Sequence, residues 1–349
     1  MSKSDLSTGA DVTDPVRVGL NGFGRIGRNV FRAVMDDPRI ELVGINDVMS
    51  GEDMRYLAAY DSVMGRLDGV SYDDGSEELV VGDSAVPVLD EQDPADLPWD
   101  EFDVDVALEC TGVFRTHEDA ERHVAAGADT VVISAPPKGE QPVKQLVYGV
   151  NHDEYAGESV VSNASCTTNS VTPVAKVLDE EFGIEYGLLT TVHAYTGSQN
   201  LVDGPKGKTR RGRAAAENIV PTSTGAAKAA TEILPQLQGK LDGMAMRVPV
   251  PNGSITELVV DLESSPSAPE INDAFRAAAD EGPLAGVLGY TDDEVVSRDI
   301  LGLPFSSYAD LPSTNTVGED GLAKILTWYD NEYGFSNRLL DVAAFVDAN

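Results

Sequence analysis

The sequence predicts an α/β protein: a doubly wound parallel sheet, followed by a second, α+β domain with a mixed or antiparallel sheet. Short apolar runs alternate with helical patterns from residue 16 to about 165, and longer apolar runs follow residue 166. Strand–helix alternation favours parallel strands, because each crossover uses a helix to bring the chain back. A chain of 349 residues is long enough for about two domains.

The first half contains short elements in regular alternation. Helices are expected at 24–37 and 116–128, and apolar runs predict strands at 16–20, 41–47, 104–110, 130–136, 145–150 and 159–165. His117 and His123 fall on the second helix, whose polar character predicts that both are solvated. Residues 1–15 are polar and acidic without an apolar stretch, so we expect a disordered leader rather than a signal peptide.

Beyond residue 165 the apolar runs lengthen, which places a domain boundary there and predicts domains of 16–165 and 166–332. Strands are expected within 187–195, 243–251, 255–263 and 325–334, and helices at 167–183, 267–282 and 336–349. Pro173 predicts that the first of these helices bends or starts late.

The charge of the chain is strongly acidic. Twenty-five Lys and Arg against 59 Asp and Glu give a net charge of −34. Such a chain repels itself at low salt, and concentrated salt screens that repulsion, which predicts a salt-adapted, halophilic protein. Nucleic acid and anionic membranes are poor partners for this charge, and no apolar run of 18 residues predicts a membrane span. Two distant cysteines suit a reducing cytoplasm.

A glycine motif lies between the first strand and the first helix. Gly22, Gly24 and Gly27 form G-x-G-x-x-G, and Asp47 follows 20 residues after Gly27, at the end of the second strand. In this context the glycines allow a tight turn and close approach of a pyrophosphate, and the carboxylate can accept from ribose hydroxyls. The alternative is a glycine turn that only packs a helix on a sheet. We therefore predict a Rossmann domain that binds NAD, since Asp47 would repel a 2′-phosphate.

Cys166 stands between a predicted strand and a predicted helix, in the stretch SNASCTTNS. A thiol needs an imidazolium or a helix N-terminus to become a nucleophile, and both are available here. His193 is the best placed of the four histidines, within the apolar run TTVHAYT. A histidine on an apolar strand is more often a satisfied core residue, so spacing alone leaves its role open. A small buried thiol suits Cys110 better than Cys166.

The charge reverses locally between residues 203 and 247, where eight basic residues face four acidic ones. Arg offers a bidentate fork to phosphate, and the hydroxyls and backbone N–H groups of 222–225 add further donors. An anionic ligand or an acidic neighbouring subunit explains this segment; a solvated basic loop is the alternative.

Six ordered stretches together resemble phosphorylating glyceraldehyde-3-phosphate dehydrogenase of the bacterial and eukaryotic type: NGFGRIGR, SNASCTTN, TVHAYT, RRGRAAAENIVPTSTGAAKA, MAMRVPVPN and WYDNEYGFSNR. The resemblance spans about residues 16 to 349. It implies a Rossmann domain, a catalytic domain, and a C-terminal helix (333–349) that packs back on the first domain. It also implies a homotetramer that acts in glycolysis or gluconeogenesis.

The resemblance assigns a role to each matching position. The nucleophile falls on Cys166, which forms a thioester, and the base on His193. The sites for glyceraldehyde 3-phosphate and inorganic phosphate fall on Ser165, Thr167, Thr196, Arg211, Thr224, Gly225 and Arg247. Besides the three glycines, the cofactor site falls on Arg25, Ile26, Asp47, Thr111, Ser134 and Asn331, and no metal is implied.

Two alternatives to this assignment and one to its cofactor stay open. Erythrose-4-phosphate dehydrogenase shares the fold and nucleophile but ends in hydrolysis. A non-catalytic nucleotide-binding protein on the same scaffold should have lost the nucleophile or the base, and here both are present. Strict NAD users of the family commonly have Leu-Pro where this chain has Gly204-Pro205. The smaller glycine leaves room for a 2′-phosphate, so NADP stays an alternative cofactor to NAD.

Overall fold

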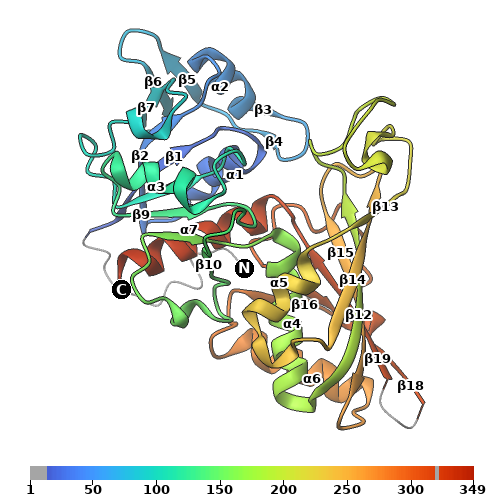
Figure 1. Ribbon diagram of the computed structural model, residues 1–349. Coiled ribbons are helices and arrows are strands. Elements are labelled where there is room, and N and C mark those ends of the chain that lie inside the picture. Colours follow the sequence, from blue (N-terminus) through green and yellow to red (C-terminus); the bar gives the residue numbers. More distant parts are fainter. Residues whose placement is uncertain (1–13, 319–321) are drawn as a thin grey trace. The chain divides into compact units, whose positions relative to one another are not determined.

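The computed structural model describes residues 14–318 and 322–349, and it divides into two compact units (Figure 1). The first unit comprises the described residues up to Leu146, together with His152–Ala164 and Ser336–Asn349. The second comprises Val147–Asn151 and the described part of Ser165–Phe335. The leader predicted for residues 1–15 lies almost entirely outside the described residues.

The first unit contains a nine-stranded sheet in the order β10-β11-β9-β8-β1-β2-β7-β6-β5. From β10 to β7 neighbouring strands run parallel, and β6 and β5 are added antiparallel at one edge. The strands are β1 Val16–Asn21, β2 Ile40–Asn46, β5 Val70–Asp73, β6 Glu78–Val81, β7 Ser84–Leu89, β8 Val106–Glu109, β9 Thr130–Ile133, β10 Lys144–Gln145 and β11 Val160–Ser162; β3 Tyr60–Asp61 and β4 Gly65–Arg66 form a separate pair.

Helices accompany this sheet as the alternating sequence pattern predicts. They are α1 Arg25–Val34, α2 Gly51–Ala59, α3 His117–Ala125 and the part of α7 (Tyr333–Asp347) from Ser336 onward, with short 3₁₀ turns η2 Pro94–Asp96 and η3 His152–Glu154. Trp99 is fully buried in a core cluster with Val131 and Ile133. α7 is tied to the unit by the Arg39–Asp341 ion pair of 2.6 Å and by the His152–Phe345 ring contact.

The second unit is built on a mixed sheet of eight strands among the described residues. Its order is β13-β14-β12-β15-β19-β17-β16, with β18 paired to β19. β12 runs parallel to β14, β16 runs parallel to β17, and the remaining pairs are antiparallel. The strands are β12 Ile184–Ala194, β13 Val220–Ser223, β14 Leu241–Val248, β15 Ser254–Leu262, β16 Leu288–Thr291, β17 Ser307–Asp310, β18 Asn315–Val317 and β19 Leu322–Tyr329.

The helices of the second unit lie against one face of this sheet, as Figure 1 shows for α4, α5 and α6. They are α4 Cys166–Phe182, α5 Ala226–Ile233 and α6 Ala268–Asp280, with 3₁₀ turns η4 Thr209–Gly212, η5 Pro235–Leu237 and η6 Leu311–Ser313. α4 is buried from Thr167 to Ala175 and at Val177 and Leu178, although its first turns contain several hydroxyl and amide side chains. The predicted fold class, a parallel doubly wound sheet plus a mixed sheet, is confirmed.

Two local predictions were wrong. The strand expected at 145–150 ends at Gln145, and Val147–Asn151 form turns that belong to the second unit. The helix for which Pro173 predicts a bend or a late start begins at Cys166 and contains the proline, so it does not start late. Proline removes one N–H from the helix interior, and the burial of Thr167–Ala175 around it offsets that loss.

Candidate active site

Cys166 and His193 meet in the second unit. Cys166 is the first residue of α4, and His193 lies near the end of β12, 27 residues later. The Cys166 Sγ lies 3.4 Å from the His193 Nε2, a hydrogen-bonding distance for sulfur. Ser165 caps α4 by accepting from the Thr168 N–H at 3.0 Å, so the thiol lies at the positive end of the helix dipole.

The tautomer of His193 follows from its second nitrogen. Nδ1 lies 2.7 Å from the carbonyl oxygen of Ala194, which can only accept, so Nδ1 carries the proton. Nε2 then presents a lone pair to the thiol of Cys166. Arg247 Nη1 lies 3.0 Å from Nδ1 and donates to the same carbonyl at 2.8 Å. Both groups are donors, so the Arg247–Nδ1 approach is a close contact rather than a hydrogen bond.

Burial and the charge of Arg247 shape the acid–base properties of the pair. Burial, then the Arg247 guanidinium, lowers the pKa of His193 to about 3, so the imidazole is neutral without a bound anion. Burial also raises the pKa of the Cys166 thiol, and it is opposed by Arg247 and by hydrogen bonding to Thr167. The pair therefore rests as thiol and imidazole, with Nε2 ready to take the thiol proton.

Strand register brings Arg247 to this pair. In the parallel pairing of β12 with β14, His193 and Arg247 are direct Cα partners. A chain of contacts continues from Arg247 to Thr196 Oγ1 at 3.4 Å, from Thr196 to Ser198 at 2.8 Å, and from Ser198 to Arg211 Nη1 at 3.5 Å. Two arginines and two hydroxyls thus adjoin the cysteine–histidine pair, and this set suits a phosphate dianion. Ser198 was not among the predicted residues.

The other predicted phosphate ligands also lie in the second unit, and their contacts there are defined. Arg211 Nε also donates to Thr222 Oγ1 at 3.0 Å, at the strand that leads to Thr224 and Gly225. Thr224 Oγ1 accepts from the Ala226 N–H at 3.1 Å, and Gly225 is the N-cap of α5, with open space where a Cβ would lie. The hydroxyl of Thr167 is buried and contacts Tyr329 Oη at 3.0 Å.

Tyr329 is a site residue that sequence reasoning missed. Its ring packs edge-on against His193, with centroids 5.9 Å apart, and its hydroxyl contacts Thr191 at 2.8 Å as well as Thr167. Burial raises its pKa, so it stays protonated and holds both threonines. The only sequence signal was its membership of the stretch WYDNEYGFSNR.

The glycine turn of the first unit has the form of a dinucleotide cradle. Gly22 has φ +98°, and a Cβ on it would lie 2.6 Å from the Thr111 nitrogen. A Cβ on Gly27 would lie 1.9 Å from the Gly22 carbonyl oxygen, whereas a Cβ on Gly24 would meet nothing within 4 Å. The turn is therefore closed beneath and open at Gly24, the N-cap of α1, which has no side-chain cap. A helix N-terminus without a side-chain cap, beside open space at Gly24, fits a pyrophosphate.

The remaining predicted cofactor residues of this unit surround the turn. Asp47 Oδ2 accepts from the Phe23 N–H at 2.6 Å, and Thr111 lies exposed just after β8. Arg25 forms an ion pair with Asp61, the Ile26 carbonyl accepts from Ser336 Oγ at 3.4 Å, and Ser134 hydrogen-bonds the buried Cys110.

Asn331 belongs to the second unit and is buried there. Its Oδ1 accepts from Ser254 Oγ at 2.7 Å, and Ser254 Oγ accepts from the Ala194 N–H at 3.1 Å. These two bonds fix the orientation of the Asn331 amide. Ser254 was also not predicted from the sequence.

A glycine turn at the edge of a doubly wound sheet is characteristic of the NAD-dependent dehydrogenases. Residues 16–117 match the family model described as the NAD binding domain of glyceraldehyde 3-phosphate dehydrogenase, and 165–331 match its C-terminal domain. The chain belongs to the glyceraldehyde-3-phosphate dehydrogenase family, whose members are NAD-dependent phosphorylating dehydrogenases.

Individual relatives agree with this assignment. The chain is 68% identical over 335 residues to glyceraldehyde-3-phosphate dehydrogenase of Haloarcula vallismortis, with 96% of this chain and 99% of that protein covered. Identity is 53% over 335 residues with the protein of the same name from Streptomyces coelicolor, covering 95% and 98% of the two chains. It is 50% over 334 residues with that of Geobacillus stearothermophilus, at the same coverage. Within the described residues, every helix is too short or too polar to cross a bilayer.

Proposed function

We propose that this chain oxidises D-glyceraldehyde 3-phosphate in the presence of inorganic phosphate to 1,3-bisphosphoglycerate, with NAD as hydride acceptor. The observation that carries the proposal is the 3.4 Å contact between Cys166 Sγ and His193 Nε2, with Arg247 beside it. The first unit would bind the cofactor through the glycine turn and Asp47. The second unit would carry the chemistry.

Cys166 and His193 divide the covalent steps between them. His193 Nε2 takes the thiol proton while Sγ adds to the aldehyde carbon, and the proton passes to the carbonyl oxygen to give a hemithioacetal. His193 then removes that hydroxyl proton as hydride leaves the same carbon, and a thioester remains on Cys166. NAD supplies the acceptor for this hydride when bound. A phosphate oxygen finally attacks the thioester carbon, the acyl–sulfur bond breaks, and protonated His193 returns its proton to the leaving sulfur, so that thiol and neutral imidazole are restored.

The arginines connect phosphate binding to the base. Arg247, and to a smaller degree Arg211, lower the pKa of His193 by charge repulsion. A phosphate dianion beside them would offset that repulsion and favour the imidazolium that forms during catalysis. Binding of the phosphate groups would thus prepare His193 to hold a proton at the steps where one must be taken up.

The experiment that tests this function measures NADH formation from glyceraldehyde 3-phosphate with and without phosphate. We expect phosphate-dependent turnover, a lower kcat/KM with NADP because of Asp47, and a loss of at least about 10³-fold in Cys166→Ser. Cys110→Ser is the matched control, because it makes the same change at a buried thiol whose pKa is raised by burial and keeps a hydrogen-bonding group towards Ser134, so the rate should stay unchanged. Phosphate-independent turnover of erythrose 4-phosphate would instead support the erythrose-4-phosphate enzyme.

We also propose a homotetramer. The outer face of the second sheet exposes a row of apolar side chains, among them Tyr186 and Leu188, 64% and 65% exposed, with Leu322 beside them. Exposed apolar patches of this kind mark interfaces, and a second copy of the same face is a self-complementary partner. Sedimentation of the wild type and of Leu188→Glu would test this, with a smaller species expected for the variant.

The free thiol that the mechanism needs favours a reducing compartment, so we place the enzyme in the cytoplasm.

A further inference from the structure

A buried polar cluster lies at the carboxyl edge of the first sheet, where three neighbouring strands end. Asn21 ends β1, Asn46 ends β2 and Glu109 ends β8, and Asn21 is the direct Cα partner of both others. All three are almost completely buried. Their side chains are linked, because Asn46 Nδ2 donates to Asn21 Oδ1 at 2.7 Å and Asn21 Nδ2 donates to Glu109 Oε2 at 2.7 Å. The cluster directly underlies the turn that starts at Gly22.

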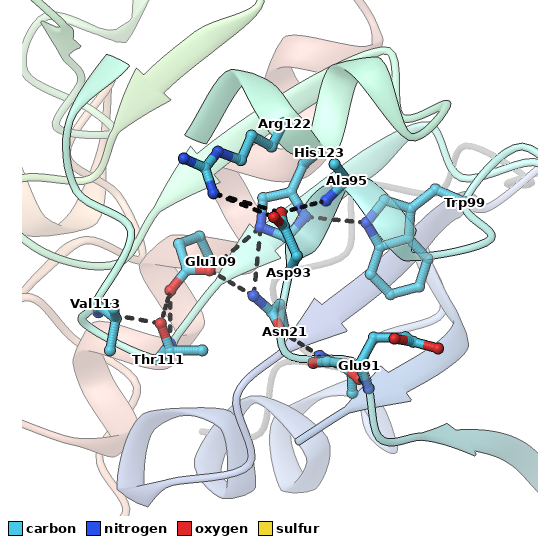
Figure 2. Close-up of polar contacts among 11 residues, drawn as sticks. Asn21, Glu91, Asp93, Ala95, Trp99, Glu109, Thr111, Val113, Arg122 and His123 are labelled. Atoms are coloured by element: carbon cyan, nitrogen blue, oxygen red, sulfur yellow. Dashed lines mark hydrogen bonds and ion pairs between the residues drawn. The ribbon is translucent and has the colours of Figure 1, made fainter. Parts of the chain in front are cut away.

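Four donors converge on the carboxylate of Glu109, as Figure 2 shows. Oε2 accepts from Asn21 and lies 3.2 Å from His123 Nε2. Oε1 accepts from the Thr111 N–H at 2.8 Å and from the Thr111 hydroxyl. A carboxylate accepts at both oxygens. The amide of a glutamine would place its NH2 group, which can only donate, against the two donors at one of these positions. The site therefore requires glutamate rather than glutamine.

His123 completes the cluster, contrary to the solvated position that its polar helix predicts. It is fully buried, and its Nδ1 accepts from the Trp99 indole N–H at 3.0 Å (Figure 2). An indole nitrogen can only donate, so Nδ1 carries no proton and the Nε2–H donates to Glu109. The wrong prediction came from the polar residues around His123 on α3, although the one face that packs on the sheet holds His123 and Ala120.

The cluster holds the loop that follows β8, beside the glycine turn. Thr111–Val113 is exposed, and the Thr111 hydroxyl both donates to Glu109 and accepts from the Val113 N–H at 3.1 Å. The Thr111 backbone nitrogen also packs against Gly22, at a distance that leaves no room for a side chain. One buried carboxylate thus fixes both the loop after β8 and the residue before the glycine turn.

We propose that Glu109 and His123 are positioning residues of the dinucleotide site, which set the conformation of the Thr111–Val113 loop and of the glycine turn without touching the cofactor. Trp99 fixes the His123 tautomer, His123 and Asn21 orient the Glu109 carboxylate, and Glu109 holds Thr111. This inference rests on the proposed cofactor site of the first unit. Its test measures NAD binding directly and does not depend on turnover.

The experiment measures the Kd for NAD by calorimetry, and the melting temperature without NAD, in Glu109→Gln and in the control Val131→Ala. Val131 is fully buried in the same core, so its truncation destabilises the unit without reaching the loop. We expect Glu109→Gln to raise the Kd about tenfold or more, because two donors lose their acceptor. Val131→Ala should lower the melting temperature and keep the wild-type Kd. An unchanged Kd in Glu109→Gln, with a melting temperature lowered like that of the control, would overturn the proposal.

A second pair of variants decides the matter if Glu109→Gln does not fold. His123→Gln keeps a donor near the position of Nε2, and His123→Asn keeps only an acceptor near the position of Nδ1. We expect the glutamine variant to retain most of the affinity for NAD and the asparagine variant to lose several-fold. Equal Kd values in the two variants would show that His123 only fills space.

Discussion

At the scale of single residues, the charge of Arg247 acts on both members of the reactive pair. Its guanidinium lowers the pKa of His193 and opposes the rise that burial causes in the pKa of Cys166. In Arg247→Gln the positive charge that opposes the rise in the pKa of Cys166 is absent, so we expect the midpoint of Cys166 alkylation by iodoacetamide to move to higher pH. The measurement is the alkylation rate against pH, followed at Cys166 by mass spectrometry. Arg66→Gln, at an exposed arginine of the other unit, should leave the profile in place; a midpoint that moves to lower pH in Arg247→Gln would contradict the argument.

His193 also contributes a pH dependence to stability. Its pKa is about 3 in the folded chain, well below the ordinary value of 6.5. Below pH 6.5 the unfolded chain therefore binds a proton that the folded chain does not, and the folded state loses stability as the pH falls. His193→Asn lacks this contribution. Between pH 6.5 and 5 the stability of the variant should improve relative to wild type by up to about 1.4 kcal/mol per pH unit, as measured by urea denaturation. A constant difference across that range would argue against a buried neutral histidine.

Cys166 and His193 could be singled out from the sequence itself, whereas Arg247 was expected only through the family resemblance and Tyr329 and Ser254 were not expected at all. Cys166 and His193 stand out because each is an unusual residue type for its local pattern. Arg247 comes beside His193 only through the parallel register of β12 and β14, which joins residues 54 positions apart. Tyr329 and Ser254 are ordinary residues of apolar strands, and only the pairing of those strands reveals that they hold His193 and Asn331.

At the scale of elements, two glycines of the turn between β1 and α1 have different roles: Gly27 is required by the packing of the turn, and Gly24 by cofactor binding. A Cβ on Gly27 would collide with the Gly22 carbonyl, but one on Gly24 meets open space. We expect Gly27→Ala to cost about 1–3 kcal/mol of unfolding free energy through overpacking. Gly24→Ala should cost at most about 1 kcal/mol, as a poorer N-cap, yet weaken NAD binding about tenfold by filling the cradle. Urea denaturation and calorimetry measure the two effects, and tight NAD binding by Gly24→Ala would refute the cradle.

Elements were predictable where a regular pattern continued for several residues. The strands and helices around the glycine turn follow alternation and periodicity that tertiary packing reinforces. The failures have specific causes. The run 145–150 is apolar because Leu146, Val147 and Val150 are buried outside any strand, and burial alone does not distinguish a strand from irregular backbone. Pro173 predicted a bend or a late start, but α4 begins at Cys166 and packs against the sheet and the neighbouring helices.

At the scale of the whole molecule, a net charge of −34 dominates the response to salt. The ion pairs of the described residues are mostly exposed and weak singly, so they do not offset the general repulsion among the acidic side chains. The Debye length falls from about 10 Å at 0.1 M salt to about 3 Å at 1 M, which is shorter than most spacings between surface charges. Repulsion should therefore decline steeply in this range and little beyond it.

We expect the melting temperature to rise between 0.1 M and 1 M KCl and to level off above that, as measured by calorimetry at constant pH. The levelling distinguishes screening from salting-out of apolar surface, which continues to strengthen with concentration. NaCl should give the same curve as KCl if screening is responsible, whereas sucrose at equal osmolality should not reproduce the steep part. A melting temperature that is higher in dilute buffer than in molar KCl would show that the acidic surface is not an adaptation to salt.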